Sequence, residues 1–450
     1  MISIFVGMAA AIPGCWLICY LYRAPMFATC LILIIFSVEA LIASSDSLVV
    51  AGTNIFPPDL VFVPIALVAI LRIFNKGSFK PLMLGWIFFG GVLFVNFILG
   101  SFLYGKAAGV EFRGYFYFWS GCLYFMSFKI SEIPVILIGR YWIKVAILIS
   151  SVVIIRWATD AAGLTDWTVV GAGVPLRVIT AGQAFFLACG LIILIGININ
   201  RMGLKPSRLL IWLLFIVILL LQHRSVWLAA VIGSGTLYFF MEGKITNKIG
   251  PVVGILSILV VVGAFMSTTD FGKKAIASIE DSGVEAVRGE GTVSARTYSW
   301  IQLLNQWQQA GLKTQLIGFP FGTTHSRFES DLSTEAVEYA PHNFYLETLL
   351  RSGLIGLSTF LFIIVKAIYG LWKIERYRVP VSGYAGVFLA LIVGEVVYFI
   401  PYGAGYEQTI IFGLALNLAS SVSSQKLQMI SQVIAQQVLI PCERIVSDVH

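Results

Sequence analysis

Long apolar runs separated by short polar connections dominate the chain and predict membrane-spanning helices. One helix needs ~20 apolar residues to cross the hydrocarbon core of a bilayer. Two of the runs, 114–128 and 407–421, are short enough to be re-entrant or tilted, so we expect about 12–13 spans. The runs are 2–21, 25–43, 55–74, 82–104, 114–128, 141–157, 180–198, 209–222, 225–241, 249–267, 343–365, 382–400 and 407–421.

The connections divide the chain into four regions. Residues 1–267 form a transmembrane bundle of about ten spans, and 342–421 hold the last membrane helices. Between them, 268–341 is the one long polar stretch, and 422–450 is predicted to be an amphipathic tail. When the connection at Arg23 is placed in the cytoplasm, most Lys and Arg of the short loops fall on that side, as the positive-inside rule requires. The long loop then lies on the outer side of the membrane, and the tail lies in the cytoplasm.

One segment of the long loop, "SARTYSWIQLLNQWQQAG", has helical spacing of its apolar residues. Trp300, Leu303, Leu304 and Trp307 share one face, and Gly311 marks the end. A helix with two tryptophans on its apolar face is typical of the membrane–water interface. We therefore predict a short interfacial helix on the outer side of the membrane.

The composition excludes a soluble globular protein. Hydrophobic residues make up 58% of the chain and charged residues only 12%, whereas soluble domains carry roughly 25% charged residues. The N-terminus lacks the basic region of a cleaved signal peptide and is predicted to be the first span. Basic cytoplasmic loops explain the net charge of +7 without nucleic acid as a partner. The six cysteines show neither metal-ligand spacing nor a disulfide framework.

Three arginines lie where apolar runs reach the predicted outer surface. Arg224 follows His223 in the short connection of "LQHRSVWLAA", Arg296 opens the loop helix, and Arg177 precedes the run at 180–198. Each could be an arginine that reaches lipid headgroups, or in the case of Arg296 a merely exposed side chain. Together they place guanidinium groups at one membrane surface without matching carboxylates in the short loops.

A further group of polar residues lies at the start of the run at 343–365. His342 and Asn343 are expected at its rim, whereas Glu347 and Arg351 are four residues apart, the spacing of an ion pair on one helical face. We interpret Glu347–Arg351 as a structural pair. Gly353 and Gly356 suit close helix packing.

Two carboxylates, Asp59 and Glu395, stand alone inside apolar runs. Ionisable groups at such depth are costly and need a reason. We expect both to be hydrogen-bonded helix contacts.

The arginines and the histidine suit the binding of a diphosphate and the removal of a proton from a hydroxyl. Arginine binds phosphate oxygens in bidentate fashion, so two or three of them suit a diphosphate. A histidine at the same level suits a general base that takes a proton from a hydroxyl. The sequence contains no metal-binding or nucleotide-binding motif in a suitable setting, so we expect neither a metal nor another cofactor.

The motifs resemble those of the O-antigen ligase and polymerase superfamily. "PHNFYLETLLRSGLIGL" resembles its His-Asn…Gly-x-x-Gly signature, "RSVWLAAVIG" its Arg-x-x-Trp-Leu-Ala helix start, and "SARTYSWIQLL" its loop helix with Arg and Trp. The resemblance covers roughly residues 175–357 together with the topology of many spans and one large late outer loop.

The resemblance implies an inverting, metal-independent glycosyltransferase with a GT-C-like fold in the bacterial inner membrane. Its active site would face the periplasm and transfer a glycan from undecaprenyl diphosphate to a hydroxyl. By motif, Arg224 and Arg296 would hold the diphosphate and His342 would activate the acceptor or steady the site. Arg177 and Asn343 are expected to bind the diphosphate or the glycan.

The members of this superfamily differ in the acceptor that receives the glycan. The arrangement of "LIGFPFGTTHSRF" before the signature favours a polymerase of O-antigen or exopolysaccharide, which would use a saccharide acceptor and a chain-length regulator as partner. A ligase acting on lipid A–core remains open. The rivals from other classes are a flippase or transporter of lipid-linked sugars and a purely structural assembly partner.

Overall fold

The structure of the chain is a computed structural model. It describes residues 14–42, 48–50, 53–76, 79–164, 177–199, 208–240, 292–328, 336–338, 341–376 and 382–421. The predicted span 249–267, residues 268–291 of the long loop and the tail 422–450 lie outside the described residues.

The structure confirms an all-α polytopic membrane protein. Each helix that matches a predicted span begins and ends within a few residues of it, apart from α5 and α6, which begin earlier, and α14, which ends later. The helices are α2 (Pro25–Ile42), α3 (Pro57–Lys76), α4 (Pro81–Tyr104), α5 (Lys106–Met126), α6 (Val135–Ala161), α7 (Ala181–Ile199), α8 (Arg208–Leu220), α9 (Arg224–Phe240), α12 (Thr292–Gln309), α13 (Leu312–Ile317), α14 (Phe344–Arg376), α15 (Ser382–Tyr398) and α16 (Gln408–Ser420).

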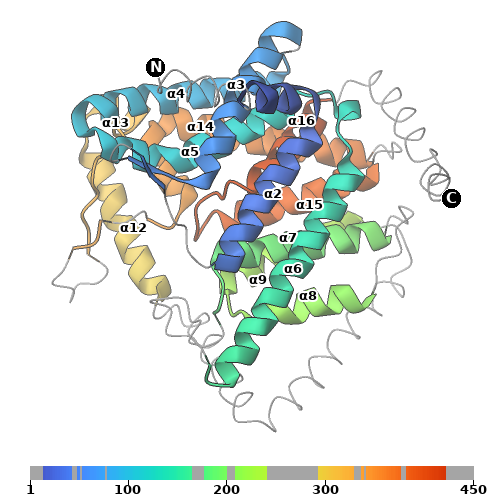
Figure 1. Cartoon of the computed structure of the whole chain (residues 1–450). Coiled ribbons are helices and arrows are strands. Elements are labelled where there is room, and N and C mark those ends of the chain that lie inside the picture. The colour runs from blue at the N-terminus through green and yellow to red at the C-terminus, as the bar shows by residue number, and fades with distance from the viewer. Residues whose placement is uncertain are drawn as a thin grey trace, which may run out of the picture.

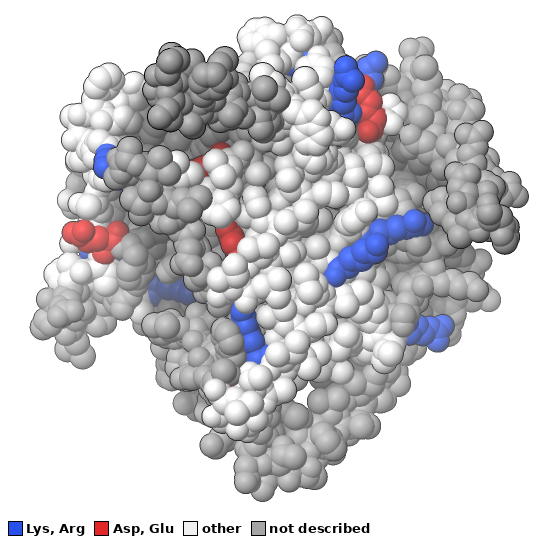
Figure 2. Space-filling model, viewed as in Figure 1, with Lys and Arg blue, Asp and Glu red and all other residues white. Residues whose placement is uncertain are grey.

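Five of the described helices are long and apolar enough to cross a membrane: α2, α3, α4, α6 and α14. Four shorter apolar helices, α7, α8, α15 and α16, lie among them. The face seen in Figure 2 has few charged side chains over α2 and α6, as expected for a surface that contacts lipid. Leu41, Ile34 and Ile155 are among the large apolar side chains exposed on these two helices.

The helices pack into one bundle around a continuous apolar core. In this bundle α15 packs on α9 and α7, α14 on α4, and α16 on α5 (Figure 1). Helix α12 lies at one edge of the molecule, beside α13 (Figure 1). Helices far apart in sequence therefore meet, and their ends bring the connections between them together.

One element was not predicted from the sequence. Residues Leu48–Val50 (β1) and Thr53–Ile55 (β2) form a two-stranded antiparallel hairpin between α2 and α3. A hairpin this short has no apolar run or alternation long enough to be distinguished from a loop.

The predicted loop helix exists as α12, and its apolar face packs on α14. Leu303 is buried against Leu346, Leu349 and Leu350 of α14, and Trp300, Leu304 and Trp307 pack around the same cluster. The expected face was correct, and α14 covers its central residue, Leu303. Because α12 is anchored to α14 in this way, it carries Arg296 to the start of that helix.

Helix α14 is interrupted at Gly353, where φ is 63° and ψ is −167°. This region of backbone conformation is essentially restricted to glycine. A side chain at Gly353 would overlap the backbone of Leu316 in α13, and the amide of Phe319 donates a hydrogen bond to the carbonyl of Leu350 (2.6 Å). The close packing expected of Gly353 is therefore confirmed, and its neighbour is the short helix that precedes the "GFPFG" turn.

Replacing Gly353 by alanine should destabilise the protein by at least ~2 kcal/mol, because the backbone strain and the overlap with Leu316 act together. The apparent melting temperature of the purified protein in detergent measures this. The matched control is Gly91→Ala in α4, where an added methyl meets no atom within 4 Å. That change should be neutral or stabilising, since alanine is the better helix former; equal melting temperatures for the two variants would contradict the expectation.

The expected Glu347–Arg351 pair is wrong. Arg351 is 3% exposed, and its Nε donates to Oε1 of Glu111 in α5 at 2.5 Å. Its terminal nitrogens donate to the carbonyls of Pro320 (2.9 Å) and Thr323 (2.7 Å). The partner comes from another helix because α5 packs beside the break in α14, where the polar backbone of the 318–323 turn also needs donors.

The two lone carboxylates behave differently. Asp59 accepts a hydrogen bond from Tyr117 (2.5 Å) and forms an ion pair with Arg113 (3.2 Å), as expected of a helix contact. Glu395 in α15 is fully buried, and neither of its carboxylate oxygens has a hydrogen-bond partner within the described part of the chain. The hydrogen-bonded contact expected for Glu395 is therefore wrong.

Candidate functional site

Each predicted site residue lies at a helix end or in a connection. Arg224 is the first residue of α9, Arg296 is near the start of α12, and Arg177 precedes α7. His342 and Asn343 immediately precede α14. Helix N-termini present free backbone N–H groups and positive dipole ends, so Arg224 adds its guanidinium to a terminus that already favours anions.

The first point of convergence is the segment 177–182, which leads into α7. A terminal nitrogen of Arg177 donates to the carbonyl of Gln222 (3.1 Å), and Nε2 of His223 lies 3.1 Å from the carbonyl of Ile179. Both contacts join this segment to the tight turn between α8 and α9, in which Gln222 has a positive φ of 55°. The segment therefore holds Arg177 beside the turn that carries Arg224.

His223 belongs to the framework of this turn. It is 6% exposed, and burial, with Arg177 nearby, lowers its pKa to about 4. At neutral pH the ring is uncharged, and the contact with Ile179 anchors it. It positions Arg224 without adding charge to the site.

The second point of convergence is the turn 399–407, between α15 and α16. Arg296 donates to the carbonyl of Pro401 (3.4 Å), and its guanidinium lies 5.4 Å from the centroid of the Tyr402 ring. The amide of Phe344, at the start of α14, donates to the carbonyls of Phe399 (2.9 Å) and Tyr402 (3.2 Å). The same turn therefore holds Arg296 and the start of α14 with His342.

The backbone at His342 is held from both sides. Asn343 caps α14 by accepting a hydrogen bond from the amide of Leu346 (3.0 Å), and Trp300 of α12 donates to the carbonyl of Pro341 (2.7 Å). His342 has a positive φ of 48° and an exposed side chain. Strained backbone of this kind is uncommon outside glycine and persists where its surroundings fix it, often at functional sites.

Aromatic contacts join the two points of convergence. Phe185 of α7 stacks on Tyr398 at the end of α15 (4.1 Å between centroids), and Tyr398 stacks on Tyr402 (5.1 Å). The segment 177–182 and the turn 399–407 are thus neighbours. All five predicted residues contact one of them directly or sit on an adjoining helix start.

The turn 399–407 is the part of the site that sequence reasoning missed. Its sequence, "FIPYGAGYE", combines Pro401, Gly403 and Gly405 with tyrosines between two apolar runs. These residues predict a turn, but nothing in the pattern says that it would meet His342 or Arg296, which lies 105 residues before Pro401. The signal that could have found it is the density of tyrosines and glycines at a predicted outer end.

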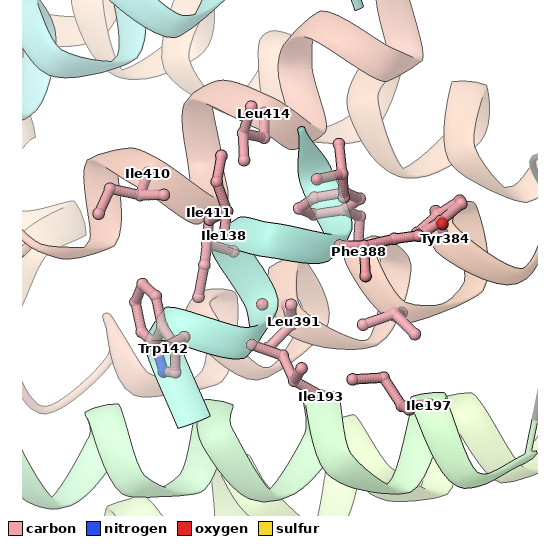
Figure 3. Close-up of a pocket in the computed structure, with 14 residues that line it drawn as sticks. Ile138, Trp142, Ile193, Ile197, Tyr384, Phe388, Leu391, Ile410, Ile411 and Leu414 are labelled. Atoms are coloured by element: carbon pink, nitrogen blue, oxygen red, sulfur yellow. The ribbon is translucent and has the colours of Figure 1, made fainter. Parts of the chain in front are cut away.

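A separate cavity of about 60 Å³ lies between α6, α7, α15 and α16 (Figure 3). Its lining is apolar apart from the Trp142 and Tyr384 side chains, and it includes none of the five predicted residues. A space lined this way supplies no acid, base or cation for chemistry. Among the described residues no group of three or more His, Cys, Asp or Glu could hold a metal ion.

These features define a class: a multi-pass membrane protein with arginines and a histidine gathered where several helices begin. Residues 209–361 match the family model for O-antigen ligases, and this match supports the resemblance to the O-antigen ligase/polymerase superfamily. The matched region runs from α8 into α14 and contains Arg224, Arg296, His342 and Asn343; Arg177 and the turn 399–407 lie outside it. No curated protein matches the chain.

Proposed function

We propose that the protein is a glycosyltransferase of the inner membrane that works at the periplasmic face. It transfers a glycan from undecaprenyl diphosphate to a hydroxyl of a saccharide acceptor, as a polymerase of O-antigen or exopolysaccharide. The observation that supports this is that Arg177 and Arg296 are held at two neighbouring turns, with Arg224 at the start of α9 beside the first and His342 at the start of α14 beside the second.

The chemistry follows from the residue types. Arg224 and Arg296, with Arg177 beside them, bind the diphosphate and stabilise the negative charge that grows on it as the glycosidic bond breaks. His342 takes the proton of the acceptor hydroxyl while the new bond forms on the opposite face of the sugar, which inverts the anomeric centre. None of these steps uses a metal ion.

The family match also favours a second candidate, since its model describes O-antigen ligases. A ligase would use the same donor and the same arginines and would transfer the glycan to lipid A–core. The two functions differ in the acceptor alone.

The test is reconstitution of the purified protein in lipid vesicles with undecaprenyl-diphosphate-linked repeat units. Release of undecaprenyl diphosphate supports a transferase, and its absence together with movement of the intact lipid across the bilayer supports a flippase instead. Elongation with the repeat units alone identifies a polymerase. A requirement for added lipid A–core identifies a ligase.

His342→Asn should lower the release rate on the order of 100-fold, because it removes a general base. Asparagine tolerates the positive φ of position 342 better than alanine does, so this substitution preserves the backbone conformation. We expect the KM for the lipid-linked donor and the melting temperature to stay near their wild-type values, since the side chain is exposed. A variant with full release rate would remove His342 from the mechanism.

A further inference from the structure

Glu407 is a buried carboxyl group at the end of the turn 399–407 that the proposed mechanism does not use. It is 3% exposed and immediately precedes α16. Within the described residues its carboxylate has no hydrogen bond to another residue. A side chain at Gly405 would overlap this carboxylate, so the glycine leaves the space that Glu407 occupies. Its own backbone amide hydrogen-bonds to the carboxylate, and burying a carboxyl group with so little compensation is costly and needs an explanation.

The carboxyl group of Glu407 faces the beginning of α7. A methyl group built on Gly182 would lie 3.9 Å from Oε1 of Glu407, 3.9 Å from the hydroxyl of Tyr398 and 4.0 Å from the hydroxyl of Thr180. Three oxygen atoms that can form hydrogen bonds therefore lie around the position that a side chain would occupy at Gly182. Thr180 is exposed, so this group of atoms reaches the surface of the site.

Among the described residues, no cation forms an ion pair with Glu407. The groups that face it electrostatically are Glu39 of α2, Glu395 and Tyr398 of α15, Tyr406 of the turn and Cys189 of α7. None of them is a cation. Tyr406 donates its hydroxyl to Glu39 at 2.6 Å, so Glu39 already has a partner. These groups supply no cation that could bind a diphosphate, which separates this part of the site from the arginines.

Burial, with Glu39 adding repulsion, raises the pKa of Glu407 to about 8. The folded-state pKa is above that of a free glutamate, so the acid form prevails at neutral pH and is lost as the pH rises through about 8. A carboxylic acid can donate one hydrogen bond and accept others. That combination matches a sugar hydroxyl, which also does both.

We propose that Glu407, together with Tyr398 and Thr180, binds hydroxyl groups of the acceptor saccharide. This inference rests on the proposed function and places the acceptor on the α7–α16 side of the turn, away from the diphosphate. The stacked Tyr398 and Tyr402 rings continue from this position towards Arg296, so acceptor and donor would meet along the turn.

The test measures binding of the repeat-unit oligosaccharide, freed from its lipid by mild acid, to the intact protein in nanodiscs. Glu407→Ala should raise the Kd about tenfold or more, the loss expected for hydrogen bonds to a hydroxyl. Glu407→Gln should bind nearly as wild type, because an amide donates and accepts like the neutral acid. Wild-type binding should weaken above pH 8, whereas binding by the glutamine variant should stay constant.

The matched control is Glu395→Gln, a second buried carboxyl group of the same neighbourhood that lies inside α15. It should leave the Kd unchanged. Wild-type affinity in Glu407→Ala, equal losses in both variants, or no binding by the wild type would overturn the inference. Release of undecaprenyl diphosphate is measured on the same preparations. Its absence with oligosaccharide binding intact would count against the proposed function and leave the role of Glu407 standing.

Discussion

Replacing Arg296 by alanine is expected to lower the release of undecaprenyl diphosphate by on the order of 100-fold or more, and Arg224→Ala should do the same. Each guanidinium would stabilise charge that develops on the leaving diphosphate, and the loss of one such group typically costs this much. Arg296→Lys should be intermediate, since an ammonium keeps the charge and loses the bidentate geometry. The release rate at saturating donor, with purified protein in vesicles, is the measurement.

The matched control is Lys313→Ala. Lys313 is an exposed cation of α13 in the same predicted periplasmic loop as Arg296, and it makes no contact with the turn 399–407 among the described residues. Its removal should change the release rate by less than about twofold, as for an ordinary surface charge. If Arg296→Ala and Lys313→Ala were equally active, the assignment of the diphosphate to Arg296 would be wrong.

Replacing Arg351 by alanine is expected to lower the free energy of unfolding by about 3–5 kcal/mol, the usual cost of removing one partner from a buried ion pair. The guanidinium is almost fully buried and satisfies Glu111 and two carbonyls of the 318–323 turn. Its loss leaves the Glu111 carboxylate in a partly buried position and the Pro320 and Thr323 carbonyls without this donor. The melting temperature of the purified protein reports the change.

A double variant separates charge from packing. In Arg351→Met with Glu111→Gln, no unpaired charge is left behind and most of the side-chain volume is kept. We expect it to be more stable than Arg351→Ala. A double variant that is less stable than the single one would show that the hydrogen bonds to the turn, and not the buried carboxylate, set the cost.

The sequence predicted the helices well because length and hydrophobicity decide whether a segment can cross a membrane. The run 82–104 became α4 (Pro81–Tyr104), and 225–241 became α9 (Arg224–Phe240). What could not be predicted was which helices meet. Arg351 was paired with the nearest carboxylate at helical spacing, whereas its actual partner, Glu111, lies 240 residues away in sequence.

The candidate site also has a part that could be predicted from the sequence and a part that could not. The side chains that carry charge, Arg224, Arg296 and His342, could be singled out because ionisable groups are expensive at a membrane surface and need a reason. The turn that brings two of them together contains mostly uncharged residues, such as Tyr402 and Pro401, which act through a ring face and a backbone carbonyl. Such contacts leave no mark in a hydropathy pattern.

The interruption of α14 at Gly353 also has a consequence for the part of the helix that can lie outside the lipid. The whole helix has 33 residues, about 50 Å at ~1.5 Å per residue, far more than the ~30 Å of hydrocarbon. The section after the break, 354–376, is by itself long enough to cross. The section before it, braced by α12 and α13, need not lie in the hydrocarbon, and under the proposed function a water-soluble sugar chain would approach His342 there while its lipid carrier stays in the bilayer.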